Sequence, residues 1–210
     1  MEIRPLSEHP ISGFLHVPDH PNGGGMVLTH GAGGSCGAPL LVAVANALAS
    51  DGMLVLRCDL PFRQKRRLGP PFPAQAAEDR AGLFAAAAKM RQLATGRILL
   101  AGHSYGGRQA SLVCAEAGDA ADGLLLLSYP LHPPKKPDNL RTAHFPDIRT
   151  PALFVHGTND PFGSMEEMQS AVAAIPSRTA IAFVPGAGHD LLKGKFDVDA
   201  VVVRGLRDLR

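Results

Sequence analysis

The stretch Gly102-His103-Ser104-Tyr105-Gly106 decides the fold of this chain, because it follows the apolar run 97–101 and precedes a helix-forming segment. A serine flanked in this way, between a strand and a helix, is typical of the sharp turn called a nucleophile elbow. Glycines are needed on both sides because a Cβ there would collide with a neighbouring strand or with the start of the helix. An ordinary glycine-rich turn would share the residues but would not need a strand before it and a helix after it.

Short apolar runs alternate with longer helical patterns along the chain. Six runs are almost continuously apolar, as in parallel strands covered on both faces: 24–30, 53–58, 97–101, 123–128, 152–156 and 179–184. Five helices are predicted over 39–50, 74–95, 106–117, 164–174 and 197–209, and an extra edge strand over 12–17. The irregular segment 129–150 is too short for a helical lid domain. The pattern predicts one doubly wound α/β domain over 1–210, with a mostly parallel sheet.

The composition is that of a soluble globular protein, with 45% hydrophobic and 19% charged residues. A net charge of +2 and the lack of a long apolar stretch predict neither a nucleic-acid partner nor a membrane span. Cys36, Cys58 and Cys114 show no C-x-x-C spacing, and the N-terminus has no signal-peptide core. We therefore expect a cytoplasmic protein without a disulfide framework. Histidine spacings typical of a metal site are also missing, so neither a metal nor a cofactor is expected.

Two short basic clusters interrupt this balance, one at 63–67 and one at Lys135 and Lys136, both in proline-rich segments. For both clusters the favoured interpretation is a solvated loop. An alternative interpretation is that they attract anionic substrates. Nucleic-acid binding through 63–67 is a weaker third, because the cluster is short and has no interleaved aromatic residues.

A serine hydroxyl becomes a useful nucleophile when a histidine accepts its proton and an acid orients that histidine. In the order that follows a nucleophile elbow, both partners lie after Ser104. The run 152–156 leads through a turn to Asp160, and the run 179–184 leads through a glycine-rich loop to His189. Since the ends of parallel strands meet at one edge of the sheet, Ser104, Asp160 and His189 are the predicted catalytic residues.

Other interpretations of these residues stay open at this point. Asp160 could cap the helix that starts near Ser164 or close the turn with its side chain, and His189 could be a surface loop histidine. Asp147 and Asp190 are alternative acids, although Asp190 is adjacent to His189 and is poorly placed to face the same imidazole.

Acyl transfer also needs hydrogen-bond donors for the developing oxyanion. We predict the backbone N–H of Tyr105, after the nucleophile, and that of Ala32, in the glycine-rich loop that follows the run 24–30. A phosphate-binding loop is excluded there because no Gly-Lys-Ser/Thr follows. His30 and His103 are expected to pack or to brace loops rather than to take part in catalysis.

Taken together, these motifs resemble the α/β-hydrolase superfamily. More narrowly, the chain resembles small lidless bacterial hydrolases of the testis-expressed-30 and NSL-complex-subunit-3 group, near the dienelactone-hydrolase-like proteins. The blocks that carry the resemblance are 29–33, 59–62, 102–108, 129–134, 156–163 and 188–189. Members of that group often have Lys and Met where this chain has His103 and Tyr105. Dienelactone hydrolases proper carry a cysteine in place of Ser104, which argues against that activity.

The resemblance implies a single-domain α/β-hydrolase fold without a lid and places Ser104, Asp160 and His189 in the triad. The expected activity is hydrolysis of a carboxylic ester or thioester of a small-molecule acyl substrate. Hydrolysis of peptide or C–C bonds, and a non-catalytic interaction protein, are the alternatives. The site is expected to be open and shallow, and Phe62, Tyr129 and His132 are its predicted pocket residues.

Overall fold

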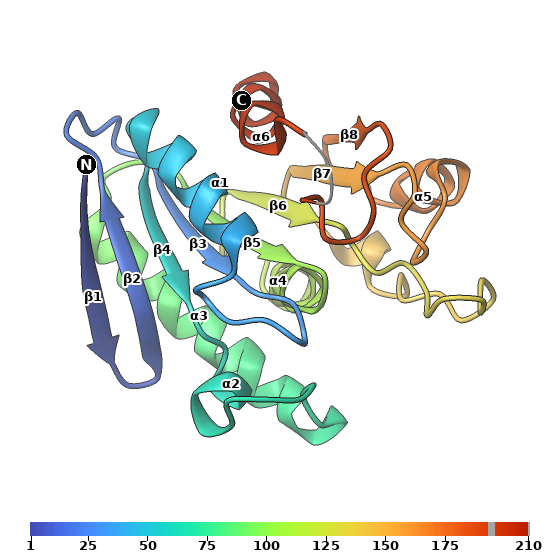
Figure 1. Ribbon diagram of the computed structural model, residues 1–210, viewed down its shortest axis with the longest axis horizontal. Coiled ribbons are helices and arrows are strands. Elements are labelled where there is room, and N and C mark those ends of the chain that lie inside the picture. The colour runs from blue at the N-terminus through green and yellow to red at the C-terminus, as the bar shows by residue number, and fades with distance from the viewer. Residues whose placement is uncertain (193–195, 210) are drawn as a thin grey trace.

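An eight-stranded sheet runs through the molecule in the order β1-β2-β4-β3-β5-β6-β7-β8 (Figure 1). The computed structural model describes residues 1–192 and 196–209. The six predicted strands are confirmed to within two residues and are all parallel. They are β3 (Gly25–Thr29), β4 (Leu54–Cys58), β5 (Ile98–His103), β6 (Gly123–Leu127), β7 (Ala152–Gly157) and β8 (Thr179–Val184). A fold of this kind brings the carboxyl ends of all six strands to one edge.

Helices cover both faces of the sheet, as the alternating pattern predicts. One face packs against α1 (Pro39–Ser50) and α6 (Val198–Asp208), while the other packs against α3 (Ala76–Leu93), α4 (Tyr105–Glu116) and α5 (Met165–Val172). Figure 1 shows α1 and α6 in front of the sheet and α3 behind it. The predicted helices agree with these bounds to within two residues.

The continuous apolar runs are explained by this two-sided cover. In β5, Ile98 and Leu100 belong to the core beneath α3 and α4, whereas Leu99 and Ala101 belong to the core beneath α1 and α6. Successive side chains of a strand point to opposite faces, so a strand buried on both faces needs apolar residues throughout. β5 is therefore held rigidly at the middle of the sheet, where it carries the nucleophile elbow.

Among the described residues, one strand and one α-helix are not predicted from the sequence. β1 (Glu2–Glu8) pairs antiparallel with β2 (Ile11–Val17), so the predicted edge strand is in fact the second strand of a hairpin. α2 (Pro61–Lys65) is a short helix with its proline in the first turn, where a missing N–H costs nothing. Between β6 and β7 the chain forms only the 3-10 turn η2 (Phe145–Asp147), so no helical lid is inserted there. No helix in the described ranges is long and apolar enough to cross a membrane.

Candidate active site

Ser104 stands at the turn between β5 and α4 in a conformation that is unusual for a serine, with φ 51° and ψ −115°. Its N–H donates to the carbonyl of Leu127 at 2.8 Å, which ties the turn to the neighbouring strand β6. A Cβ at Gly102 would lie 2.4 Å from the backbone of Gly106, and one at Gly106 would lie 2.5 Å from the carbonyl oxygen of His30. Only glycine fits at these close approaches, as the motif predicts, and the strained turn is fixed by its surroundings.

His189 connects Ser104 to Asp160. Its Nε2 lies 2.8 Å from Ser104 Oγ, and its Nδ1 lies 2.8 Å and 3.0 Å from the two carboxylate oxygens of Asp160. Because a carboxylate can only accept, Nδ1 carries the proton and Nε2 is left to accept the serine hydroxyl hydrogen. The three residues come from the loops after β5, β7 and β8, and the geometry is that of an activated nucleophile, its base and an orienting acid.

The carboxylate of Asp160 is held by more than the histidine. Its side chain is fully buried, and Oδ1 also accepts the N–H of Phe162 at 2.9 Å. The interpretation of Asp160 as a helix cap is wrong, because Ser164 caps α5 through a hydrogen bond from the N–H of Glu167. A buried carboxylate that accepts several hydrogen bonds is well suited to hold one tautomer of His189.

The two alternative acids lie elsewhere. Asp147 belongs to the exposed end of η2, and Asp190 accepts the N–H of Leu192 at 3.2 Å. The Nδ1 of His189 faces the carboxylate of Asp160 instead.

Two aromatic groups fix the position of the His189 ring. Phe162 lies against it, with ring centroids 4.2 Å apart and planes inclined at 30°. His103, within the elbow, has its ring centroid 5.3 Å from that of His189, and its Nε2 donates to the backbone carbonyl of His189 at 2.8 Å. Burial lowers the pKa of His103 to about 4, so this imidazole is neutral and acts as a fixed donor. His103 therefore braces the loop of the histidine, which is the role that the sequence predicts for it.

The glycine-rich loop after β3 is held by a buried arginine. Arg63, in α2, is 5% exposed, and its guanidinium donates to the carbonyls of Ala32 (2.8 Å) and Gly34 (2.7 Å). The same group also donates to the carbonyls of Arg66 and Gly69, at 3.1 Å and 3.0 Å. The planar guanidinium of Arg63 thus joins the loop that carries Ala32 to the segment after α2.

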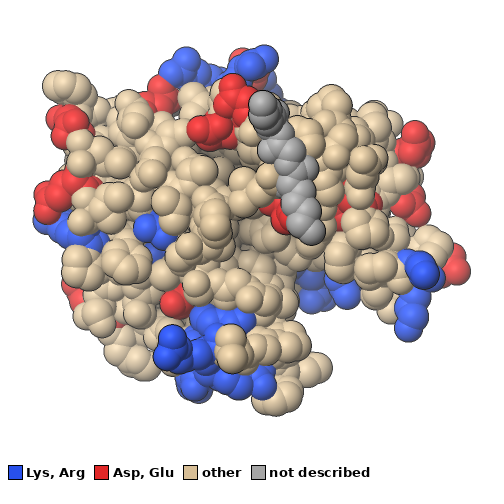
Figure 2. Space-filling model, in the orientation of Figure 1, with Lys and Arg blue, Asp and Glu red and all other residues tan. Residues whose placement is uncertain are grey.

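The prediction of a solvated basic loop is therefore wrong for Arg63. Its neighbours do form a basic surface, and Figure 2 shows Lys and Arg gathered over α2 and the segment that follows it. Arg63 differs from them because carbonyl oxygens from two separate loops converge on it, and the spacing of residues along the chain does not reveal that convergence. His30 supports the same loop by donating from Nδ1 to the carbonyl of Gly31 at 2.8 Å.

Tyr105 is fixed at the start of α4 by a buried carboxylate. Its hydroxyl donates to Asp79 Oδ2 at 2.7 Å, and Asp79 Oδ1 accepts the N–H of Phe62 at 3.0 Å. Burial raises the pKa of Asp79. As the first residue of the helix, Tyr105 has an N–H without an intrahelical acceptor. This N–H is therefore available beside Ser104.

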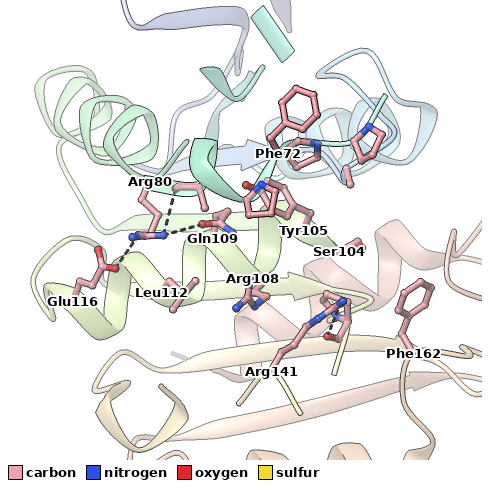
Figure 3. A pocket seen from close by; sticks show the side chains of 16 residues that line it. Phe72, Arg80, Ser104, Tyr105, Arg108, Gln109, Leu112, Glu116, Arg141 and Phe162 are labelled. Carbon is pink, nitrogen blue, oxygen red and sulfur yellow. Dashed lines mark hydrogen bonds and ion pairs between the residues drawn. The ribbon is translucent and has the colours of Figure 1, made fainter. Parts of the chain in front are cut away.

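A cavity of about 720 Å³ opens beside Ser104, and Ala32, Tyr105 and Phe162 also line it (Figure 3). Its remaining wall comes mainly from the segment after α2 and from α4. It includes Pro70, Pro71, Phe72, Arg80, Arg108, Leu112, Pro130 and Arg141.

The three predicted pocket residues do not line this cavity. Phe62 is fully buried between the rings of His30 and Tyr105, so it supports the site from behind. Tyr129 is fully buried in the core, and its hydroxyl donates to the carbonyl of Arg141 at 2.7 Å. His132 is 5% exposed and its imidazole faces Pro133 and Glu167. The prediction fails because Phe62 and Tyr129 fill the core under the loops, while His132 forms hydrogen bonds with Pro133 and Glu167.

No group of three His, Cys, Asp or Glu side chains within 1–192 and 196–209 is arranged to hold a metal ion. The polar groups near Ser104 are thus the triad partners, backbone N–H groups and arginines. These groups supply a nucleophile, a base and donors for a negative charge.

The whole fold is similar to solved hydrolase structures. An alpha/beta serine hydrolase without a lid from Xanthomonas campestris has a TM-score of 0.78 at 18% identity, over 99% of this chain and 95% of the other. A dienelactone hydrolase from Anabaena variabilis has a TM-score of 0.75 at 18% identity, over 99% and 96%. A serine hydrolase homologue from Coxiella burnetii has a TM-score of 0.74 at 18% identity, over 98% and 97%. A family model for an alpha/beta hydrolase domain also matches residues 23–199, and the chain belongs to the alpha/beta hydrolase family.

Proposed function

We propose that this protein is a serine hydrolase that cleaves a carboxylic ester or thioester. The single observation that carries the proposal is the unbroken hydrogen-bonded path from Ser104 Oγ through His189 to the buried carboxylate of Asp160. A non-catalytic interaction protein would not need a strained serine, an oriented imidazole and a fully buried acid in one line. We also propose that the protein belongs to the testis-expressed-30 and NSL-complex-subunit-3 group that its motifs resemble.

The reaction proceeds in two halves. Ser104 Oγ attacks the acyl carbonyl carbon while its proton passes to His189 Nε2, and the tetrahedral intermediate collapses as His189 returns that proton to the leaving alcohol or thiol. Water then attacks the acyl-serine, with His189 as the base again, and the acid is released with Ser104 restored. Asp160 keeps the imidazole in the productive tautomer and stabilises its charged form.

The oxyanion of each tetrahedral intermediate accepts hydrogen bonds from the backbone N–H groups of Tyr105 and Ala32. The assignment of Tyr105 as a donor is supported by its N–H, which has no intrahelical acceptor, and by the hydrogen bond that fixes its side chain to Asp79. The assignment of Ala32 as a donor is supported by its position in the wall of the cavity beside Ser104. Donors that are fixed before the reaction cost no reorganisation when the charge appears.

A fluorophosphonate probe tests the proposal directly. We expect the probe to label the purified protein at Ser104, because only an activated serine displaces its leaving group rapidly. Mass mapping of the adduct identifies the residue, and a His189→Ala variant should lose the label. A folded protein that takes up no label would contradict the proposal and favour the interaction-protein alternative. Turnover of matched ester, thioester, peptide and C–C substrates then separates the remaining bond types.

Arg63 gives a second prediction, because it holds the loop that carries Ala32. Lysine at this position keeps the charge but cannot reach four carbonyl oxygens at once. We expect Arg63→Lys to lower kcat by about 10–100-fold with a smaller change in KM, since loss of one oxyanion donor costs about 10²–10³. Steady-state kinetics on an ester that the wild type hydrolyses measures this split.

Arg67→Lys is the matched control, because Arg67 is exposed in the same basic cluster. It should retain wild-type kcat. An Arg63→Lys enzyme with unchanged kcat, or with a change in KM alone, would show that Arg63 does not position the oxyanion loop.

A further inference from the structure

The cavity beside Ser104 is strongly basic away from the triad. Three arginines, Arg80, Arg108 and Arg141, line it, against a single acidic residue, Glu116. Figure 3 shows that they come from different elements and that Arg80 extends toward Glu116 and Gln109. Burying like charges together is unfavourable unless something compensates them. The partners of each arginine therefore show whether the charge is already neutralised.

Arg80 is compensated within the protein. Its Nε lies 2.8 Å from Glu116 Oε1, and Nη1 lies 3.4 Å from Gln109 Oε1. Its positive charge is thus matched by Glu116, the one acidic residue among the described residues that line the cavity.

Arg108 is not compensated in this way. It lies one helical turn after Ser104, with its N–H donating to the Ser104 carbonyl at 2.9 Å, and a turn of this length rises about 6 Å. Its Nε is buried without a hydrogen-bond partner. No carboxylate in the described part of the chain forms an ion pair with it.

Arg141 is the second uncompensated cation. Its backbone is anchored by the hydroxyl of Tyr129, but among the described residues its guanidinium makes only a 3.4 Å hydrogen bond to the carbonyl of Pro130. Burial, together with the nearby charge of Arg108, lowers the pKa of Arg141. Both side chains line the same cavity, so their like charges disfavour each other there.

The titratable side chains beside Arg108 are neutral. Burial and the charge of Arg108 lower the pKa of His144 to about 4, and burial raises the pKa of Tyr129. Neither an imidazole without a proton nor a protonated phenol supplies negative charge. Arg108 and Arg141 thus face the cavity as an unneutralised pair.

We propose that Arg108 and Arg141 bind a carboxylate of the substrate, so that the enzyme acts on esters or thioesters that carry a carboxylate a few bonds from the reacting carbonyl. Guanidinium groups match a carboxylate with two parallel hydrogen bonds each, and such charge-assisted bonds are among the stronger ones in proteins. The anion would relieve the repulsion between the two cations and would satisfy the free donors. This inference rests on the proposed hydrolysis at Ser104, since it names the class of substrate for that site.

Pairs of substrates that differ only in charge test the proposed carboxylate site. The first pair is 4-nitrophenyl hydrogen adipate and its neutral monoamide, which places the charge on the acyl side. The second pair is 4-acetoxybenzoate and 4-acetoxybenzamide, which places it on the alcohol side. We expect kcat/KM for the charged member of at least one pair to exceed that of its amide by about tenfold or more.

Substitution of each arginine should remove that preference. In Arg108→Gln and in Arg141→Gln, the ratio of kcat/KM between the charged and neutral members should fall by about tenfold. Lys136→Gln removes the same charge from an exposed position in the loop that carries Arg141, and it should leave the ratio unchanged. The two arginine variants are independent, so a folding defect in one leaves the other informative.

Binding without chemistry separates this inference from the proposed function. Adipate should raise the thermal unfolding temperature of the wild type more than adipamide does, and Arg141→Gln should abolish the difference. If no ester is hydrolysed but adipate stabilises in this way, the hydrolase proposal fails and the carboxylate site stands. If both esters of each pair are hydrolysed equally, or if both arginine variants keep the wild-type ratio, the carboxylate site is wrong.

Discussion

Replacement of Ser104 by alanine is expected to lower kcat by at least about 10⁴-fold, because no other group can form the acyl-enzyme. The hydroxyl contributes one hydrogen bond to His189, and the backbone of the turn is fixed by Gly102, Gly106 and the bond to Leu127. The variant should therefore unfold within a few degrees of the wild-type temperature. Ester turnover and thermal unfolding, measured on the same preparation, test both halves of this expectation.

Ser111 provides the matched control, since its hydroxyl is also 2.8 Å from a histidine, His144 Nε2. Ser111 is fully buried and is not part of the cavity wall. Ser111→Ala should therefore keep the fluorophosphonate label and most of the turnover. Substantial ester hydrolysis by Ser104→Ala would rule out Ser104 as the nucleophile.

Asp160→Asn is expected to lower kcat by about 10³–10⁴-fold while preserving most of the fold. An amide in place of the carboxylate no longer favours the tautomer with a proton on Nδ1, so Nε2 is poorly placed to accept from Ser104. The amide oxygen can still accept the N–H of Phe162, so the loss of stability should be moderate, about 1–3 kcal/mol. Steady-state kinetics and chemical unfolding measure the two effects.

The alternative acids supply the controls for this prediction. Asp147→Asn and Asp190→Asn leave the contacts between His189 and Asp160 in place. Both should retain kcat within a few fold of the wild type. If either loses as much activity as Asp160→Asn, the acid of the triad has been assigned incorrectly.

The sequence predicted the sheet and the positions of the triad residues because both follow from local patterns. Parallel strands buried on both faces must be apolar throughout, and their carboxyl ends must share one edge of the sheet. Asp160 and His189 each follow such a strand within a short turn, so their meeting with Ser104 could be predicted without knowing any contact. β1 gave no such signal, because an edge strand that is mostly exposed needs few apolar residues.

The cavity wall could not be predicted in the same way. Arg63 and Arg67 are four positions apart in one basic run, yet the first is buried and the second exposed. The difference arises from carbonyl groups of the Ala32 loop, which reach Arg63 only through the tertiary fold. Phe62 and Tyr129 are predicted as pocket residues because they belong to proline-rich segments beside the site, but both side chains are buried in the core.

The order of the strands has a consequence for how the protein is made. The loop that carries Ala32 follows β3 and Ser104 follows β5, whereas Asp160 and His189 follow β7 and β8. A chain emerging from the ribosome can pair the first group of strands long before the last strand exists. Until His189 has been synthesised and β8 has joined the sheet, the serine has no base and remains an ordinary alcohol. Under the proposed mechanism, the nascent protein is therefore inert toward esters, and reactivity appears only when the sheet is complete.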